Sequence, residues 1–150
     1  MSGAVLHIDA SELGDVGRRL DRLASRVSNM TPVMDEIGSM LVTSTQDRFE
    51  TGKGPDGDDW LRSIRVAEAQ GNAQTLVDSG RLRDSITHEP GNDQVEIGSN
   101  VVYAAIHQFG GEAGRGKAVT LPARPYLGLS AEDKSEIEAI IDDYLMEAFQ

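Results

Sequence analysis

Helical periodicity at both ends of the chain, and its loss in the middle, most constrains what this sequence can fold into. The first periodic stretch predicts a helix with a narrow apolar seam of the coiled-coil type that faces one partner element. The seam residues recur every three or four positions and are Leu13, Val16, Leu20, Leu23, Val27 and Met30. Asp9 and Glu12 have the spacing of a helix-capping pair. Thr31 and Pro32 predict a second helix with a capping hydroxyl, so that residues 9–50 form a helical hairpin with a very short turn.

The middle of the chain is broken by glycine and proline into short elements. Residues 51–59 predict a loop anchored by Trp60, followed by a short helix within 61–70. A helix start is predicted at 79–83, and two strands, 86–89 and 94–98, are joined by a turn at 90–93. A helical segment over 101–109, a flexible glycine-rich loop over 110–116 and an extended, proline-containing stretch follow.

The last helix carries the clearest signal. Ser130 and Asp133 have capping-box spacing. The apolar stripe behind them comprises Ile137, Ile140, Ile141, Tyr144, Leu145 and Ala148. A length of 150 residues suits one domain, 1–150. The predicted class is therefore α+β, with the N-terminal helical hairpin and the C-terminal helix packed on a small, mainly antiparallel sheet, and an α+β core over 76–150.

Composition and charge narrow the class of protein. The chain has no cysteine, which excludes disulfides, thiolate nucleophiles and cysteine-ligated metals. Its net charge of −11 argues against nucleic acids and anionic membranes as partners, because both attract basic proteins. No segment resembles a signal peptide or approaches the roughly 20 apolar residues of a membrane span. We therefore expect a soluble protein made in a cytoplasm.

Patterns that would indicate catalysis or ligand binding are weak. Residues 111–117, GEAGRGK, match the first seven positions of a phosphate-binding P-loop, but Ala118 stands where the motif has the Ser or Thr that holds magnesium. The three histidines lack metal-site spacing, and the apolar surroundings of His107 favour a hydrogen-bonded structural role over that of a base. An aspartate-rich loop at 56–59 lacks the glutamate that closes a calcium loop. We predict no catalytic residue, no cofactor and no metal.

Charge is unevenly distributed along the chain. Residues 131–150 carry seven acidic residues against Lys134 alone, whereas a basic cluster near the N-terminus comprises Arg18, Arg19, Arg22 and Arg26. Either these are two solvated helix faces, or the protein meets its neighbours, or itself, through faces of opposite sign. Asp142 and Asp143 lie near the negative end of the last helix. Candidate partners for them are Arg18, Arg22 and Arg26 of another copy, or a basic face of another protein.

Four blocks of sequence, in order, resemble the phage virion morphogenesis family. They are LVDSGRLRDSI (76–86), VEIGSN (95–100), VYAAIHQFGG (102–111) and LPARPYLGLS (121–130). The stretch at 48–60 is also similar, and the resemblance extends over residues 30–145. It implies a small, non-enzymatic α+β protein of the virion that acts at the head–tail junction in tail completion, neck assembly and head–tail joining, and that is present in the host cytoplasm during assembly. The alternative is a cytoplasmic protein-binding module without a virion role.

The resemblance also implies partners. These are further copies of the chain in a ring, six- or twelve-fold, and neck, connector, tail-terminator or tail-tube proteins, with no membrane and no sequence-specific nucleic acid. The glycine-rich loop and its flanks supply one set of candidate contact residues: Tyr103, His107, Gln108, Phe109, Gly110, Gly111, Arg124 and Tyr126. The charged helices supply a second set: Arg18, Arg22, Arg26, Asp142 and Asp143. We expect the loop to be mobile when free and ordered against a neighbour.

Overall fold

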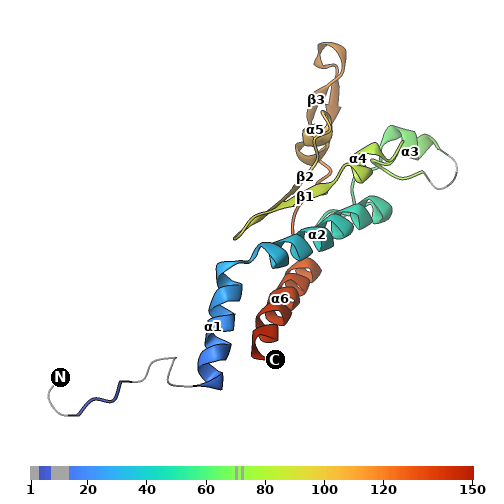
Figure 1. Cartoon of the computed structure of the whole chain (residues 1–150). Helices are drawn as coiled ribbons and strands as arrows, with labels where there is room; N and C mark the ends of the chain where they lie inside the picture. The colour runs from blue at the N-terminus through green and yellow to red at the C-terminus, as the bar shows by residue number, and fades with distance from the viewer. Residues whose placement is uncertain (1–3, 8–13, 70, 72) are drawn as a thin grey trace.

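A computed structural model of the chain describes residues 4–7, 14–69, 71 and 73–150. The helices in this part are α1 (Asp15–Ser28), α2 (Thr31–Thr51), α3 (Ile64–Glu68), α4 (Arg81–Asp84), α5 (Ala104–Phe109) and α6 (Ala131–Met146), with 3-10 turns η2 (Arg115–Lys117) and η3 (Glu147–Phe149). Two separate antiparallel hairpins pair β1 (Thr87–Pro90) with β2 (Val95–Gly98), and β3 (Gly111–Ala113) with β4 (Val119–Leu121) (Figure 1). The predicted α+β class is confirmed.

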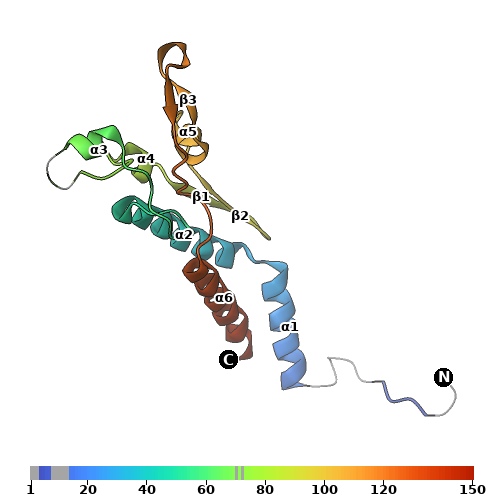
Figure 2. The same ribbon diagram turned by 180° about the vertical axis from the view of Figure 1, so that it is seen from behind.

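Helix α2 lies at the centre of the fold and contacts both the β1–β2 hairpin and α6. It has Pro32 in its first turn, where the missing N–H costs no hydrogen bond, and it ends at Gly52 in the left-handed conformation (φ 69°). The predicted hydroxyl cap is wrong, because Met30 is the N-cap and makes no side-chain bond. Val33, Ile37 and Leu41 are buried on α2, against residues of β2 and α6. The helix thus lies between the β1–β2 hairpin and α6, as both views show (Figures 1 and 2).

A second apolar cluster holds the C-terminal half of α2 to the middle of the chain. Phe49 and Tyr126 are buried with ring centroids 5.4 Å apart, and Trp60 meets Phe49 edge-on at 5.6 Å. The Trp60 indole N–H donates to the Pro125 carbonyl at 2.8 Å. The tryptophan therefore anchors the loop before it, as predicted, on the segment that leads into α6.

Helix α1 takes a different course from the predicted hairpin. A two-residue turn joins it to α2 as expected, but α1 packs beside α6 and η3 (Figures 1 and 2). The apolar face of α2 is already covered by β2 and α6, which leaves the end of α6 as the surface available to α1. The predicted caps Asp9 and Glu12, and the seam residue Leu13, lie outside the described residues. In the part of the chain that the structure describes, no helix is both long and apolar enough to cross a bilayer.

The segment predicted as a flexible loop over 110–116 is instead part of a hairpin. Gly111–Ala113 pair with Val119–Leu121, and the Lys117 N–H donates to the Gly114 carbonyl across the turn at 3.1 Å. Gly114 and Gly116 have positive φ, so these glycines shape the turn rather than loosening the chain. With α5, the hairpin projects from the body as an arm, residues 102–121 (Figure 1).

Candidate assembly surfaces

Two of the predicted contact residues, the half-buried Gln108 and the buried Tyr126, make hydrogen bonds that join segments of the chain. Gln108 on α5 accepts with Oε1 from the N–H groups of Tyr126 and Leu127, both at 3.0 Å, and donates to the Leu127 carbonyl at 3.2 Å. Tyr126 is 1% exposed and donates its hydroxyl to the Ala104 carbonyl at 2.7 Å, and burial raises its pKa. Gln108 and Tyr126 therefore clamp the segment before α6 onto α5, a position that does not fit the expected contact role.

Arg124 and His107 form the base of the arm. Arg124 is buried and donates from Nε to the Leu61 carbonyl at 2.7 Å, and its backbone N–H donates to the His107 carbonyl at 2.8 Å. Burial, and then the charge of Arg124, lower the pKa of His107. His107 Nδ1 is buried with no hydrogen-bond partner among the described residues, so the predicted hydrogen bonding of this histidine is not seen at that atom. Tyr103 packs edge-on against its ring at 5.9 Å.

The outward side of the arm is apolar. Phe109 is 78% exposed and Val102 is 95% exposed. Phe109 is the last residue of α5, and Val102 lies in the turn before this helix. Gly110 allows the backbone to turn against the next segment, because a Cβ there would lie 2.7 Å from the Ala123 nitrogen. Gly111 is exposed at the start of β3. Val102 is not among the contact residues predicted from the sequence. The signal that could have identified it is the unbroken apolar run at 101–106, since one buried face cannot cover every side chain of such a run.

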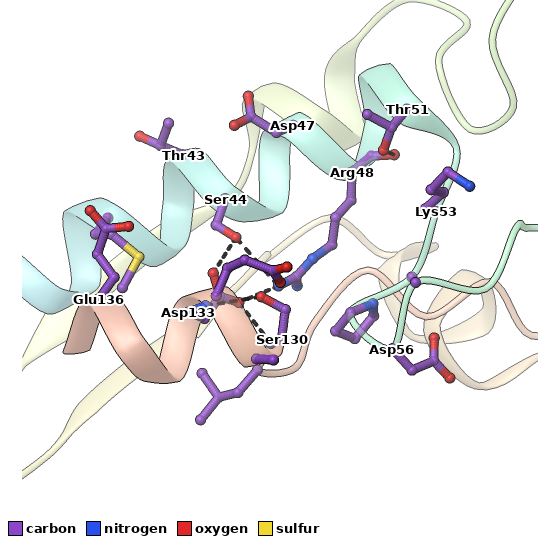
Figure 3. Close-up of a pocket in the computed structure, with 17 residues that line it drawn as sticks. Thr43, Ser44, Asp47, Arg48, Thr51, Lys53, Asp56, Ser130, Asp133 and Glu136 are labelled. Atoms are coloured by element: carbon purple, nitrogen blue, oxygen red, sulfur yellow. Dashed lines mark hydrogen bonds and ion pairs between the residues drawn. The ribbon is translucent and has the colours of Figure 1, made fainter. Parts of the chain in front are cut away.

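A buried ion pair, also missed from the sequence, joins α2 to α6 (Figure 3). Arg48 donates to Asp133 Oδ2 at 2.5 Å and to the Tyr126 carbonyl at 2.6 Å, and both side chains of the pair are less than a tenth exposed. Asp133 also accepts from the Ser44 hydroxyl at 2.5 Å and from the Ser130 N–H at 2.9 Å. The Ser130 hydroxyl accepts in turn from the Asp133 N–H at 3.0 Å, which confirms the predicted capping box.

The pair forms the floor of a cleft of about 1000 Å³ between α2, the loop at 53–57 and the start of α6. Arg48 and Asp133 are bound to each other, and Lys53 is bound to Asp59 at 2.8 Å. Four exposed carboxylates line the cleft, namely Asp47, Asp56, Glu132 and Glu136. The positive groups of the cleft are thus paired within the chain, and its rim is acidic.

The basic cluster of α1 finds partners within its own chain. Arg22 donates to the Ala148 carbonyl at 3.1 Å, and Arg26 donates to the Tyr144 carbonyl at 3.0 Å and to Glu147 at 3.1 Å. The Arg26 guanidinium also lies 4.8 Å from the centre of the Tyr144 ring. These bonds lie at the carbonyl end of α6, where a cation is favoured. Arg22 and Arg26 are therefore already bound within their own chain.

Other members of the charged set are placed differently. Arg18 pairs with the neighbouring Asp15, and both side chains are exposed. Asp142 and Asp143 are exposed, and neither is in an ion pair within the described part of the chain. Arg19 is exposed and likewise has no ion pair there. Of the predicted charged set, Asp142 and Asp143 therefore have no ion pair in the described residues, and Arg19, a member of the basic cluster outside that set, has none either.

The apolar seam predicted for α1 is largely uncovered. Val16 is 50% exposed, Leu20 is 42% exposed and Val27 is 56% exposed. Their spacing of four and seven residues keeps them on one side of the helix. Leu23 is half-buried beside them. The partner element that the seam predicts is thus not supplied by the rest of the described chain.

These features define a small α+β protein whose interior polar groups are used for structure and whose outer faces are charged or apolar. Residues 11–146 match the model of the phage virion morphogenesis family, and the chain belongs to this family. It is 35% identical to the Mu-like prophage FluMu G protein 2 of Haemophilus influenzae, over 93% of this chain and 96% of that protein. It is 36% identical to the putative capsid assembly protein G of Escherichia phage Mu, over 88% and 83% of the two chains. It is 30% identical to the tail completion protein S of Escherichia phage P2, over 81% and 91%. No solved structure shows significant similarity to the chain.

Proposed function

We propose that the chain is a non-catalytic structural protein of the phage virion that acts at the head–tail junction, completing the tail and joining it to the head. Membership of the virion morphogenesis family over residues 11–146 carries the proposal. One relative is named for capsid assembly and another for tail completion. A position where head and tail meet accounts for both names. The protein then occurs in the host cytoplasm during assembly and in the finished virion.

The proposed form is a ring of six or twelve copies that contacts neck, connector, tail-terminator or tail-tube proteins. The arm supports this form, because a hairpin of two three-residue strands is only marginally stable alone and gains from a neighbour. The arm also carries two largely exposed apolar side chains, Phe109 and Val102. Amide exchange over 110–117 should be fast in the free protein and slow in the assembled neck. Equal protection in both states would remove the arm from the interface.

The shape of the P-loop-like segment supports a non-catalytic role. A P-loop needs a strand, a phosphate-binding turn and then a helix, whereas residues 111–121 form a short hairpin. The cleft between α2 and α6 has an ion pair and a helix cap as its floor. The protein should release no phosphate from ATP above background. A release rate that disappears in Lys117→Ala would contradict the proposal.

Deleting the gene and viewing the particles by negative-stain electron microscopy tests the role. The proposal predicts filled heads and separate tails, with joining restored when the chain is supplied. Mass spectrometry of purified virions should detect the chain. Normal joined particles that lack the chain would refute the virion role and favour a cytoplasmic binding module.

A further inference from the structure

We propose that the exposed seam of α1 in one copy docks on the acidic flank of α6 in a second copy, which gives a head-to-tail contact. The seam consists of Val16, Leu20 and Val27 with Arg19 beside it. The acidic flank consists of Glu132, Glu136, Ala139 and Asp143. This inference rests on the proposed ring and names the two surfaces that would build it.

The first argument is that the seam needs a cover that its own chain does not give. Val16, Leu20 and Val27 are 42–56% exposed although they lie on one side of α1. An apolar stripe with this spacing is the geometry by which one helix packs on another. The bonds of Arg22 and Arg26 to α6 of the same chain hold α1 in place but leave these three side chains uncovered. The contact that fixes α1 to its own chain therefore leaves the seam available to a second copy.

The second argument is charge. Helix α1 has four arginines against two aspartates, a net charge of +2, whereas residues 131–150 have seven acidic residues against one lysine, a net charge of −6. Two copies of α1 facing each other would bring like charges together, whereas α1 on α6 brings opposite charges together. The occupant is therefore a second copy that presents a different surface, and not the same surface related by a two-fold axis.

The third argument is the form of the acidic flank. Glu132, Glu136 and Asp143 follow at intervals of four and seven residues, so they share one side of α6, and Glu147 follows four residues later in η3. The last of them, Glu147, is bound by Arg26 of the same chain at 3.1 Å. The others remain exposed. An acid at the end of this row thus already binds an arginine of α1. The exposed acids nearer the start of α6 could bind an arginine of a second copy in the same way.

The flank carries small side chains between its acids. Ala131, Ser135 and Ala139 are exposed on α6 beside Glu132 and Glu136. The acidic cleft adjoins the flank, since Ala131, Glu132 and Glu136 also line that cleft. Alanine and serine at these positions let a second helix approach closely. Helices in contact lie about 8–10 Å apart, and small side chains favour the lower end of that range.

Cysteine cross-linking tests the docking cleanly because the chain has no cysteine of its own. Leu20→Cys and Ala139→Cys are made in separate copies, which are mixed, oxidised and analysed on non-reducing gels and by mass spectrometry. We expect the mixed cross-link to exceed both homodimers, and to exceed the cross-link between Ile64→Cys and Ala139→Cys. Ile64 is 76% exposed on α3 and reports random collision.

A charge reversal separates docking from collision. Glu136→Lys with Asp143→Lys should lower the mixed cross-link about tenfold, because the two acids that attract Arg19 are replaced by lysines that repel it. Arg19→Glu in the other copy should recover part of it. The control Asp93→Lys with Glu96→Lys makes the same charge change at exposed positions of the β1–β2 hairpin and should have no effect.

The outcomes divide the two proposals. A mixed cross-link no stronger than the Ile64 control, or a dominant Leu20→Cys homodimer, overturns the docking of α1 on α6. Detection of the chain in purified virions is read independently of the cross-link. Virions that contain the chain without the cross-link refute the docking alone, whereas a cross-link with no chain in virions refutes the virion role and leaves the docking standing.

Discussion

Replacing Asp133 by Asn measures how strongly the buried ion pair fixes α6 to α2. The substitution keeps the volume of the side chain, but it leaves the buried Arg48 guanidinium without its opposite charge. Breaking a buried pair in this way costs about 3–5 kcal/mol. Arg48 retains its bond to the Tyr126 carbonyl at 2.6 Å, so we expect about 3 kcal/mol. A domain of this kind has a total stability of about 5–15 kcal/mol, so the loss is a large fraction.

Urea unfolding at pH 7, followed by circular dichroism, measures the loss. Glu132→Gln is the matched control, since it removes an exposed carboxylate from the same turn of α6, and we expect a change within about 0.5 kcal/mol. Arg48→Met combined with Asp133→Leu should be closer to the wild type than Asp133→Asn is, because no charge is then left buried. A loss below about 1 kcal/mol for Asp133→Asn would refute the reasoning.

The pH dependence gives a second measure of the same pair. Burial by itself would raise the pKa of Asp133, but the bonds from the Ser130 N–H and the Ser44 hydroxyl, with the charge of Arg48, outweigh burial and lower it. The carboxyl titrates near pH 3.9 when unfolded. The pair therefore stabilises the fold fully above about pH 4, and this contribution is lost as the pH falls toward the folded pKa. The advantage of the wild type over Asp133→Asn should shrink in that range, and a constant advantage would argue against the ionic contribution.

Three further changes test other parts of the fold. Gly38→Ala should lower the stability by about 1–3 kcal/mol in thermal unfolding, because the added Cβ would lie 2.3 Å from His88 Cδ2 where α2 meets β1; an unchanged melting temperature would show that the contact relaxes freely. The pKa of His107 is lowered in the fold, so the folded state loses stability as the pH falls below about 6.5, and His107→Gln should reduce that loss. A urea series from pH 5 to pH 7.5 checks this, and identical slopes for both proteins would contradict it. Asp142→Asn with Asp143→Asn removes two exposed acids near the negative end of α6 and should raise the melting temperature slightly, at about 0.3–1 kcal/mol per charge; ring or neck assembly measured on the same variant shows whether these acids also serve a partner.

The local elements could be predicted from the sequence because their signals act over a few residues. The capping box at Ser130 and the β1–β2 hairpin lie where the sequence places them. The Arg48–Asp133 pair could not be predicted, because the two residues are 85 positions apart and nothing local distinguishes them from exposed charges. The sequence predicts a loop over 110–116, where the structure has a hairpin. The local signal here is glycine, which is equally typical of a flexible loop and of a tight turn.

The difference between local signals and contacts across the fold also explains why the candidate assembly surfaces were only partly predictable. Gln108 and Tyr126 belong to blocks by which the sequence resembles its family, yet both are bonded inside the fold, so the resemblance identified the scaffold rather than a contact surface. The charged helices have opposite signs in the sequence, but the direction of α1 after its two-residue turn decides which arginines meet α6 of the same chain. Arg22 and Arg26 do so, while the apolar seam faces outward. The contact proposed between copies uses a surface that lies outside those blocks and that its own chain leaves half exposed.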